Sequence, residues 1–510
     1  MKILLIAINS RYVHPNLALG YLYEIGKKRG HKVDLKEYTI NMQPRDILLD
    51  SDFEDYDLVA FSAYIWNGDY VKKLATEMKL IKPDALYICG GPEVLGNIAD
   101  YVAIFHGVIM GEGESPFTSI LDNPGDRTRW KNVSYKGLIA GINKEESIDF
   151  SYPHEQTLGR KIVYYEAQRG CPFSCSYCMS GDTGVRYRPL DLVKQDLLTL
   201  IDNEIPLVKF VDRSFNIHIE KAIEIVEFIK ILDRGKTSFH MELSPSILPQ
   251  KFIDSLASAR EGLFQVEIGI QSTDDSVNKK VYRRIFYDDF KDNLKSFIEV
   301  FPGHVHLDLI SGLPGSTFEN IRTSYIELEK LGSDYIQLGF LKLMPGTRLY
   351  EERKKRKILA SSFAPYEVLE TGDLSFSELK LLKTIEKMMD LYPREEIPMT
   401  MAYLTRDRAS FDVYWRLAEK FPKDKLNTSL SLETRLEILG KISNELVRET
   451  LELDYARKRR NRRFIFFSGR KGPGGDYIDS YYDGEELRLE MTRYRIDYEN
   501  QVLVREDISV

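Results

Sequence analysis

The sequence predicts an α/β protein in three successive parts: a doubly wound parallel sheet, a partial (β/α)6 barrel, and a mainly helical accessory domain with a small strand-rich end. Two observations predict this class. Short apolar runs alternate with amphipathic stretches from residue 2 to about 122, and a second alternation begins at Lys161. The 510 residues, 43% of them apolar, suffice for a core in each part. We place the parts at residues 1–145, 155–370 and 375–510.

The first part consists of apolar strands typical of a parallel sheet with helices on both faces. The strands read KILLIAI, KVDLKEYT, LVAFSAYI, ALYICGG and GVIMGEGE. This pattern predicts a flavodoxin-like layer, in which ligands bind at the carboxyl ends of the strands. Glycine pairs there let a backbone approach a flat ligand closely. The loops expected at this edge are 9–16, 62–69, 90–94 and 111–115.

The second part alternates six strands with helices that begin near residues 189, 217, 249, 275 and 317. Six units are too few for the eight of a closed barrel, so we expect an open one with its chemistry at the carboxyl ends of the strands. The expected strands are 161–167, 207–214, 238–244, 264–271, 304–311 and 334–341.

The third part changes rhythm after about residue 370. Residues 376–450 have helical periodicity, and 464–510 suggest short strands with turns at 472–475 and 483–484. The basic run ARKRRNRR at 456–463 could contact RNA phosphates, or could be a solvated helix end paired with nearby acids. The net charge of −7 favours the second interpretation, and we expect no nucleic-acid partner.

No apolar run approaches the 18 residues of a membrane span, so we expect no membrane partner. The opening MKILLIAI runs into Asn9 and Ser10 without a cleavage site for a signal peptide. We interpret it as a buried strand, and the protein as cytoplasmic.

Three of the four cysteines lie within eight residues, which indicates metal or redox chemistry. Cys171, Cys175 and Cys178 have the spacing C-x3-C-x2-C directly after the first strand of the second part. Three thiolates can hold three irons of a 4Fe–4S cluster and leave the fourth iron open. The alternative, a zinc site, needs four ligands, and the nearest histidines in sequence are His154 and His218.

This cysteine motif, with Tyr177 before its last cysteine, resembles that of the radical S-adenosylmethionine (SAM) superfamily. The resemblance implies that SAM chelates the open iron and is cleaved to a 5′-deoxyadenosyl radical. EIGIQS (267–272), DLISGLPG (308–315) and MPGT (344–347) are similar to motifs of the coproporphyrinogen oxidase and methylthiotransferase branch. By that resemblance, with Arg284 as a substitute for Arg283, the contacts of SAM would be Asp212, Glu242, Gln271, Arg283 and Asp308.

GGPE and GEGE ahead of such a barrel resemble the cobalamin-binding domain of cobalamin-dependent (class B) radical SAM enzymes. The D-x-H-x-x-G motif that supplies a cobalt ligand elsewhere is absent; His14 could replace it or be an ordinary loop residue. The alternative is the cobalamin-free domain of methylthiotransferases, whose second cluster needs three further cysteines where this chain has only Cys89. The implied cobalamin contacts are Ser62, Tyr64, Trp66, Gly90, Gly91, Glu93, Gly111, Glu112 and Gly113.

The resemblance therefore implies an enzyme that binds a 4Fe–4S cluster, SAM and cobalamin and methylates an unactivated carbon. One alternative is a radical rearrangement, cyclisation or oxidation without methyl transfer. Another is a non-catalytic iron–sulfur protein that binds RNA or acts as a sensor. The enzyme would need an external electron donor such as flavodoxin or ferredoxin. The sequence does not specify the small-molecule or peptide substrate, the axial cobalt ligand or the oligomeric state.

Overall fold

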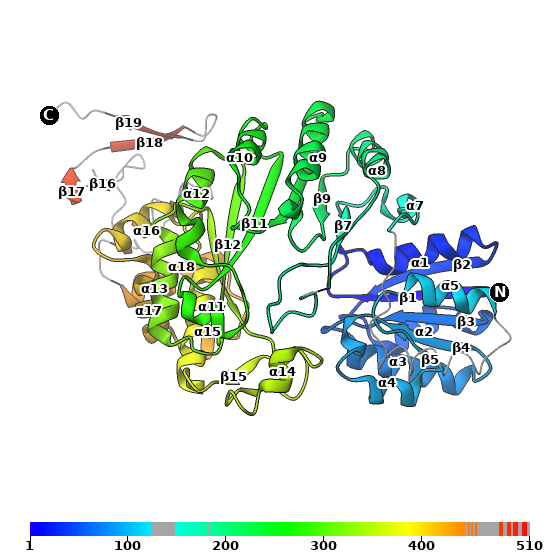
Figure 1. Cartoon of the computed structure of the whole chain (residues 1–510). Coiled ribbons are helices and arrows are strands. Elements are labelled where there is room, and N and C mark those ends of the chain that lie inside the picture. Colours follow the sequence, from blue (N-terminus) through cyan, green and yellow to red (C-terminus); the bar gives the residue numbers. More distant parts are fainter. Residues whose placement is uncertain are drawn as a thin grey trace. The chain divides into compact units, whose positions relative to one another are not determined.

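The computed structural model describes residues 1–123, 148–181 and 183–443, three short pieces between 447 and 455, and four strands between 479 and 506 (Figure 1). It forms two compact units, residues 1–321 with 331–374, and residues 322–330 with 375–510. The basic run 456–463 and the turns at 472–475 and 483–484 lie outside the described residues. Within the described residues, every helix is too short or too polar to cross a bilayer.

The first sheet has the strand order β2-β1-β3-β4-β5, and every pairing in it is parallel. This is the flavodoxin-like order, so the prediction for the first part is confirmed. The order reverses direction between β1 and β3, which places their following loops on either side of a crevice. The strands are β1 (Lys2–Asn9), β2 (Lys32–Thr39), β3 (Leu58–Ser62), β4 (Leu86–Gly90) and β5 (Gly107–Val108).

Two cores hold this sheet between helices. Leu4, Ile6 and Ile8 of β1 pack with α2 (Pro44–Asp50), α3 (Gly68–Ile81) and α4 (Ile98–Ile104). The alternate residues of the same strand pack with α1 (Leu17–Lys28) and α5 (Glu114–Asp122). Because successive strand residues point to opposite faces, one continuous apolar strand serves both cores. Burying each such leucine or isoleucine stabilises the layer by about 1.5–3 kcal/mol.

The second sheet is an open parallel barrel with the strand order β13-β12-β11-β10-β9-β6, as expected for six units. Buried and partly buried residues alternate along its strands, most regularly in β11, where Phe264, Val266, Ile268 and Ile270 are buried and the residues between them are only partly buried. The strands are β6 (Ile162–Tyr165), β9 (Leu207–Phe210), β10 (Ser238–Leu243), β11 (Phe264–Gln271), β12 (His304–Ser311) and β13 (Tyr335–Phe340).

Helices follow these strands as the sequence pattern predicts. They are α8 (Leu190–Asp202), α9 (Ile219–Leu232), α10 (Gln250–Ala257), α11 (Asp275–Lys280), α12 (Tyr287–Val300) and α13 (Phe318–Glu329). The short helix α7 (His154–Thr157) precedes the barrel. After β13 come α14 (Arg348–Glu352) and the paired strands β14 (Leu359–Ala360) and β15 (Val368–Glu370).

The second unit is helical with a strand-rich end, which confirms that prediction. A capping box of Ser375 and Glu378 begins the first helix of the third part. Its helices are α15 (Phe376–Leu391), α16 (Pro398–Thr405), α17 (Ser410–Lys420) and α18 (Leu432–Ile442). Two antiparallel pairs follow, β16 (Asp479–Tyr482) with β17 (Leu487–Glu490) and β18 (Arg493–Asp497) with β19 (Val502–Glu506).

Candidate active site

The three clustered cysteines lie in a compact loop that a two-stranded ribbon closes at its base. The ribbon pairs β7 (Gln168–Arg169) antiparallel with β8 (Arg186–Tyr187). Cys171 and Cys175 are buried, Cys178 is partly buried, and all three thiols are free. Gly170 enters the loop at a φ of +98°, and a Cβ there would lie 1.7 Å from the carbonyl oxygen of Gly184. Only glycine fits this entry.

Two segments of the barrel hold the cysteine loop in place. The amide of Ser176 donates to the carbonyl of Val281 at 2.8 Å, and the carbonyl of Ser176 accepts from the amide of Leu349 at 2.8 Å. Leu349 belongs to α14, which follows the MPGT motif, and Thr347 of that motif caps the helix through its side chain. The helix that follows the motif therefore supports the loop through its backbone.

Arg283 brings a positive charge to the thiols. Its Nη1 lies 3.8 Å from Sγ of Cys175, and its Nη2 donates to the carbonyl oxygen of Gly269. Burial raises the pKa of Cys171, and Arg283 opposes that rise. A guanidinium beside the thiol of Cys175 fits a thiolate-held cluster. Among the described residues, no group of three or more His, Cys, Asp or Glu side chains is arranged to hold a metal ion, so the positions of these side chains favour neither the zinc alternative nor the cluster.

A cavity of about 680 Å³ opens at the carboxyl edge of the first sheet, where all four predicted loops contribute to its wall. Met179, Ser180 and Thr183 of the cysteine loop line the same cavity. The cavity therefore joins the edge of the sheet to the cysteine loop. The sequence-predicted contacts that line it are Ser62, Tyr64, Trp66, Gly90, Gly91, Gly111, Glu112 and Gly113.

One wall of this cavity is aromatic. The rings of Tyr64 and Trp66 stack with centroids 4.5 Å apart and planes within 4°, and Trp66 Nε1 donates to the carbonyl of Ile8 at 3.2 Å. His14 also lines the cavity, and its Nδ1 lies 2.8 Å from the hydroxyl of Tyr164. Burial, with help from Lys209 and Arg11, lowers the pKa of His14, so its imidazole is neutral at pH 7.

Two glycines of the cavity, Gly91 and Gly113, differ in whether the protein has room for a side chain at their position. A Cβ at Gly91, where φ is +110°, would lie 2.4 Å from the carbonyl oxygen of Ala63. The fold therefore requires glycine at position 91, whether or not a ligand binds. A Cβ at Gly113 would meet nothing closer than Cδ2 of Leu22 at 3.9 Å. Gly113 therefore leaves open the kind of space that a broad corrin ring needs.

Glu93, which was predicted as a cobalamin contact, is not among the residues that line this cavity. It is 5% exposed, and its Oε1 accepts hydrogen bonds from Tyr366 at 2.5 Å and Asn97 at 2.9 Å. Burial raises the pKa of its carboxyl group. Tyr366 belongs to the segment between β14 and β15, so Glu93 ties the GGPE loop to the end of the barrel.

This buried bond predicts a pH-dependent loss of stability. Tyr366→Phe should lower the free energy of unfolding by about 1–3 kcal/mol at pH 8, because the carboxylate loses a donor that water cannot replace. The raised pKa means that the folded chain holds this proton more tightly than the unfolded chain, for which 4.5 is the reference, so stability falls as the pH rises above that value. More of the Glu93 carboxyl group is protonated at pH 5 than at pH 8. Tyr366→Phe should therefore lower the free energy of unfolding by less at pH 5.

Urea unfolding at the two pH values measures this effect. The matched control is Tyr56→Phe, whose hydroxyl donates to the half-buried Asp34 at 2.8 Å and should matter by less than about 1 kcal/mol. An equal effect of the two variants at both pH values would contradict the account of Glu93.

Three of the predicted SAM contacts lie on neighbouring strands of the barrel. Glu242 is on β10, Gln271 ends β11, and Asp308 is on β12. Gly269 is the register partner of Asp308, and a bulge follows it, which turns Gln271 to a φ of +71°. His306 Nε2 lies 3.2 Å from Asp308 Oδ1. Burial raises the pKa of Asp308 to about 6, against the opposing effect of His306.

Asp212 lies elsewhere. It is fully buried, its Oδ2 accepts from the amide of Ala167 at 3.2 Å, and burial raises its pKa well above the usual range. It lines a small separate cavity with Gln168 and Tyr187. We interpret Asp212 as a support for the strand that leads to the cysteine loop. Arg284, the proposed substitute for Arg283, is exposed.

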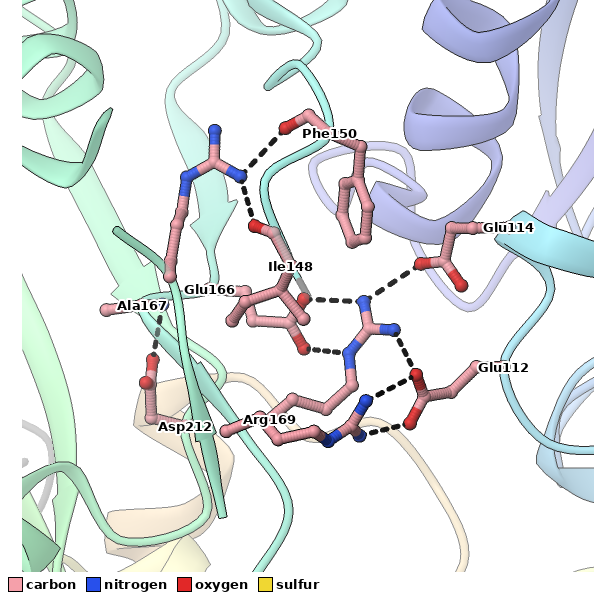
Figure 2. Close-up of polar contacts among 10 residues, drawn as sticks. Glu112, Glu114, Ile148, Phe150, Glu166, Ala167, Arg169 and Asp212 are labelled. Atoms are coloured by element: carbon pink, nitrogen blue, oxygen red, sulfur yellow. Dashed lines mark hydrogen bonds and ion pairs between the residues drawn. The ribbon is translucent and has the colours of Figure 1, made fainter. Parts of the chain in front are cut away.

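Sequence reasoning missed a set of charged side chains on the cavity wall, which we name the Arg169 cluster (Figure 2). The guanidinium of Arg169 donates to three carboxylates at 2.7–3.1 Å. In the sequence, Arg169 precedes Cys171 by two residues, and two of the acids belong to GEGES. These positions next to predicted site residues are the sequence signal that could have indicated the cluster. The cluster consists of Arg169, Arg186, Glu112, Glu114 and Glu166.

Comparisons with known proteins agree with this geometry. The radical SAM superfamily model matches residues 165–326, and the B12 binding domain model matches residues 3–121. A family of unknown function, DUF4080, matches residues 354–490. The fold and the site thus define a radical SAM enzyme with an N-terminal B12-binding domain.

Individual relatives are distant. An uncharacterized methyltransferase of Pyrococcus horikoshii is 28% identical over 66% of this chain and 78% of its own length. The cobalamin-dependent radical SAM methyltransferase TokK of Streptomyces tokunonensis is 24% identical over 63% of this chain and 52% of its own. The structure of the radical SAM methyltransferase TsrM from Kitasatospora setae, with cobalamin and a 4Fe–4S cluster bound, shares the fold, with a TM-score of 0.55, 17% identity, and 71% and 76% of the two chains covered.

The chain carries a radical SAM domain and a B12-binding domain, a combination that supports a cobalamin-dependent radical SAM enzyme and implies a 4Fe–4S cluster, SAM and cobalamin.

Proposed function

We propose that this enzyme transfers a methyl group to an unactivated carbon of a small molecule or peptide. The observation that carries the proposal is the single cavity whose wall includes both the B12-binding loops and the cysteine loop. A substrate between them would reach both cofactors. Relatives with methyltransferase names support the same reaction class.

The residues fit these groups. Cys171, Cys175 and Cys178 would hold the cluster, and Arg283 would balance the charge of its thiolates. Glu242, Gln271 and Asp308 would bind SAM through its hydroxyl and ammonium groups. When bound, these cofactors supply an electron that cleaves SAM and a methyl group for transfer. The stacked Tyr64 and Trp66 would cover a corrin ring and exclude water from it.

Two further features belong to this proposal. The cluster needs an external electron donor, such as flavodoxin or ferredoxin. A cytoplasmic location stays a prediction.

The proposal predicts a pH dependence of SAM binding. If the Asp308 carboxylate binds SAM, protonation of this group, whose pKa is about 6, should weaken binding as the pH falls. Between pH 7.5 and pH 5 the affinity should drop about ten-fold, since roughly one carboxyl in ten stays ionised one unit below its pKa. Titration calorimetry of the anaerobic, cluster-loaded chain measures this.

The variant Asp308→Asn distinguishes the effect of protonating Asp308 from the effect of protonating His306, which lies beside it. This variant should bind SAM weakly and with a shallower pH profile, since only Glu242, whose pKa burial also raises, then titrates among the carboxylates that bind SAM. The wild-type slope persisting in Asp308→Asn would remove Asp308 from the SAM site.

The combined binding of the cofactors is tested by gel filtration. The chain is reconstituted anaerobically with iron, sulfide and hydroxocobalamin and then separated from the free cofactors. We expect one corrin and four irons per chain. Protein with a full cluster but no corrin would overturn the methyl-transfer proposal and leave a radical SAM enzyme of another reaction type.

A further inference from the structure

The base of the cysteine loop contains an electrostatic conflict. Arg169 and Arg186 are direct partners in the β7–β8 ribbon. Like charges at opposed positions of an antiparallel pair destabilise it. This ribbon pairs only two residues on each strand, so its backbone hydrogen bonds cannot offset much repulsion. Some other group must make the pairing stable.

Glu112 supplies that group from the first sheet's side of the cavity. Its Oε2 accepts from Nη1 of Arg169 at 3.1 Å (Figure 2). The same Oε2 accepts from Nη1 of Arg186 at 3.0 Å, and Oε1 accepts from Nη2 of Arg186. One carboxylate thus bridges both arginines. The three side chains are only 15–20% exposed, so water screens the interaction weakly.

The remaining acids fix Arg169 alone. Glu166 accepts from Nε at 2.9 Å and Nη2 at 2.7 Å, and Glu114 accepts from Nη2 at 2.9 Å. The guanidinium lies 5.2 Å from the ring centroid of Phe150. Burial opposes the charge of Arg169, but these carboxylates outweigh burial and raise its pKa, so it stays protonated. Glu112 is the carboxylate that Arg169 and Arg186 share.

Glu112 also lies between two cavity glycines. Gly111, Glu112 and Gly113 all line the cavity, as do Arg169, Gly170 and Arg186. A ligand that packs on Gly111 and Gly113 restricts the backbone that carries Glu112. The same backbone therefore faces the corrin cavity and holds the base of the cysteine loop.

We propose that Glu112 is a positioning residue that couples the cobalamin cavity to the cysteine loop. Its carboxylate holds Arg169 and Arg186 together, and a ligand in the cavity holds Glu112. Coupling of this kind is reciprocal: corrin binding stabilises the cysteine loop, and an intact loop favours corrin binding by the same factor. The inference rests on the proposed function for the identity of the ligand, but not for the bridge itself.

Hydrogen exchange of peptides from residues 170–187 tests the bridge, in the full chain loaded with its cluster under anaerobic conditions and without cobalamin. Glu112→Gln should speed exchange in these peptides about ten-fold, since one charge-assisted interaction is lost. The matched control is Glu155→Gln, which removes a carboxylate from an exposed pair with Lys27 and should leave these peptides unchanged. Exchange in strand residues 2–9 reports whether each variant is folded.

A double substitution distinguishes the bridge from general loss of packing. In an Arg186→Gln background the two arginines no longer oppose each other, so Glu112→Gln should speed exchange by at most about three-fold. Equal effects of Glu112→Gln in both backgrounds, or no effect in either, would overturn the bridge.

Addition of hydroxocobalamin tests the coupling. It should slow exchange of residues 170–187 about ten-fold in wild type and much less in Glu112→Gln. Equal slowing in both proteins would overturn the coupling. If wild type retains no corrin, the proposed function fails and the coupling to cobalamin with it, whereas the cobalamin-free comparison still decides the bridge.

Discussion

Cys175→Ala is expected to lose at least about 99% of SAM cleavage together with most of the bound iron, because the cluster has three protein ligands and no spare one. The same result is expected for Cys171→Ala and Cys178→Ala. Cys175 is the cysteine whose thiol also contacts the guanidinium of Arg283. Iron and sulfide analysis after anaerobic reconstitution, and the yield of 5′-deoxyadenosine, measure the loss.

Cys89→Ala is the matched control. Cys89 is fully buried in β4, and burial raises the pKa of its thiol far above neutrality, so it makes a poor metal ligand. This variant should keep all its iron and its SAM cleavage. A lasting loss of about half the iron in Cys89→Ala would contradict a single cluster held by the loop cysteines.

Gly113→Val is expected to abolish retention of hydroxocobalamin while leaving the cluster intact. The added side chain enters the cavity, where its first atom meets nothing closer than 3.9 Å. It therefore blocks a ligand without a clash in the protein. Because Gly113 is the N-cap of α5, where valine is less favourable than glycine, the free energy of unfolding should fall by up to about 1 kcal/mol. Absorbance of the protein after gel filtration reports the corrin and the cluster together.

Gly372→Val controls for the substitution itself, because Gly372 is exposed, lies outside the cavity lining and has no atom within 3.6 Å of its would-be Cβ. It should retain cobalamin. Gly91→Val is a poor probe, since its clash with Ala63 would damage the sheet edge whether or not a ligand binds. Full corrin retention by Gly113→Val would move the cobalamin site away from this loop.

Periodicity sufficed to predict both sheets. A strand that is buried on both faces, such as β1, needs an apolar residue at every position. Such strands therefore appear in the sequence as continuous apolar runs between amphipathic segments. The cysteine loop could also be predicted from the sequence, because its three cysteines are close together along the chain. Placing four loops at one edge needed only the rule that parallel strands end together.

The sequence did not predict the direction of the side chains within those loops. Glu93 and Glu112 occupy similar glycine-rich motifs, yet one bonds to Tyr366 and the other bridges two arginines. Their partners are 273 and 57 or 74 positions away along the chain. The bond between Asp212 and a backbone amide 45 residues earlier could not be predicted for the same reason, and the role of Asp212 as a SAM contact stays a prediction. Such pairings depend on tertiary packing, which sequence spacing does not encode.

The most direct test of the central claim is the set of products formed from SAM. The anaerobic, cluster-loaded chain is incubated with SAM and dithionite, with and without hydroxocobalamin, and the products are identified by mass spectrometry. We expect 5′-deoxyadenosine in wild type and none in Cys175→Ala, and S-adenosylhomocysteine only when cobalamin is bound. Absence of 5′-deoxyadenosine from protein with a full cluster, or S-adenosylhomocysteine formed equally without cobalamin, would contradict a cobalamin-dependent radical methyltransferase.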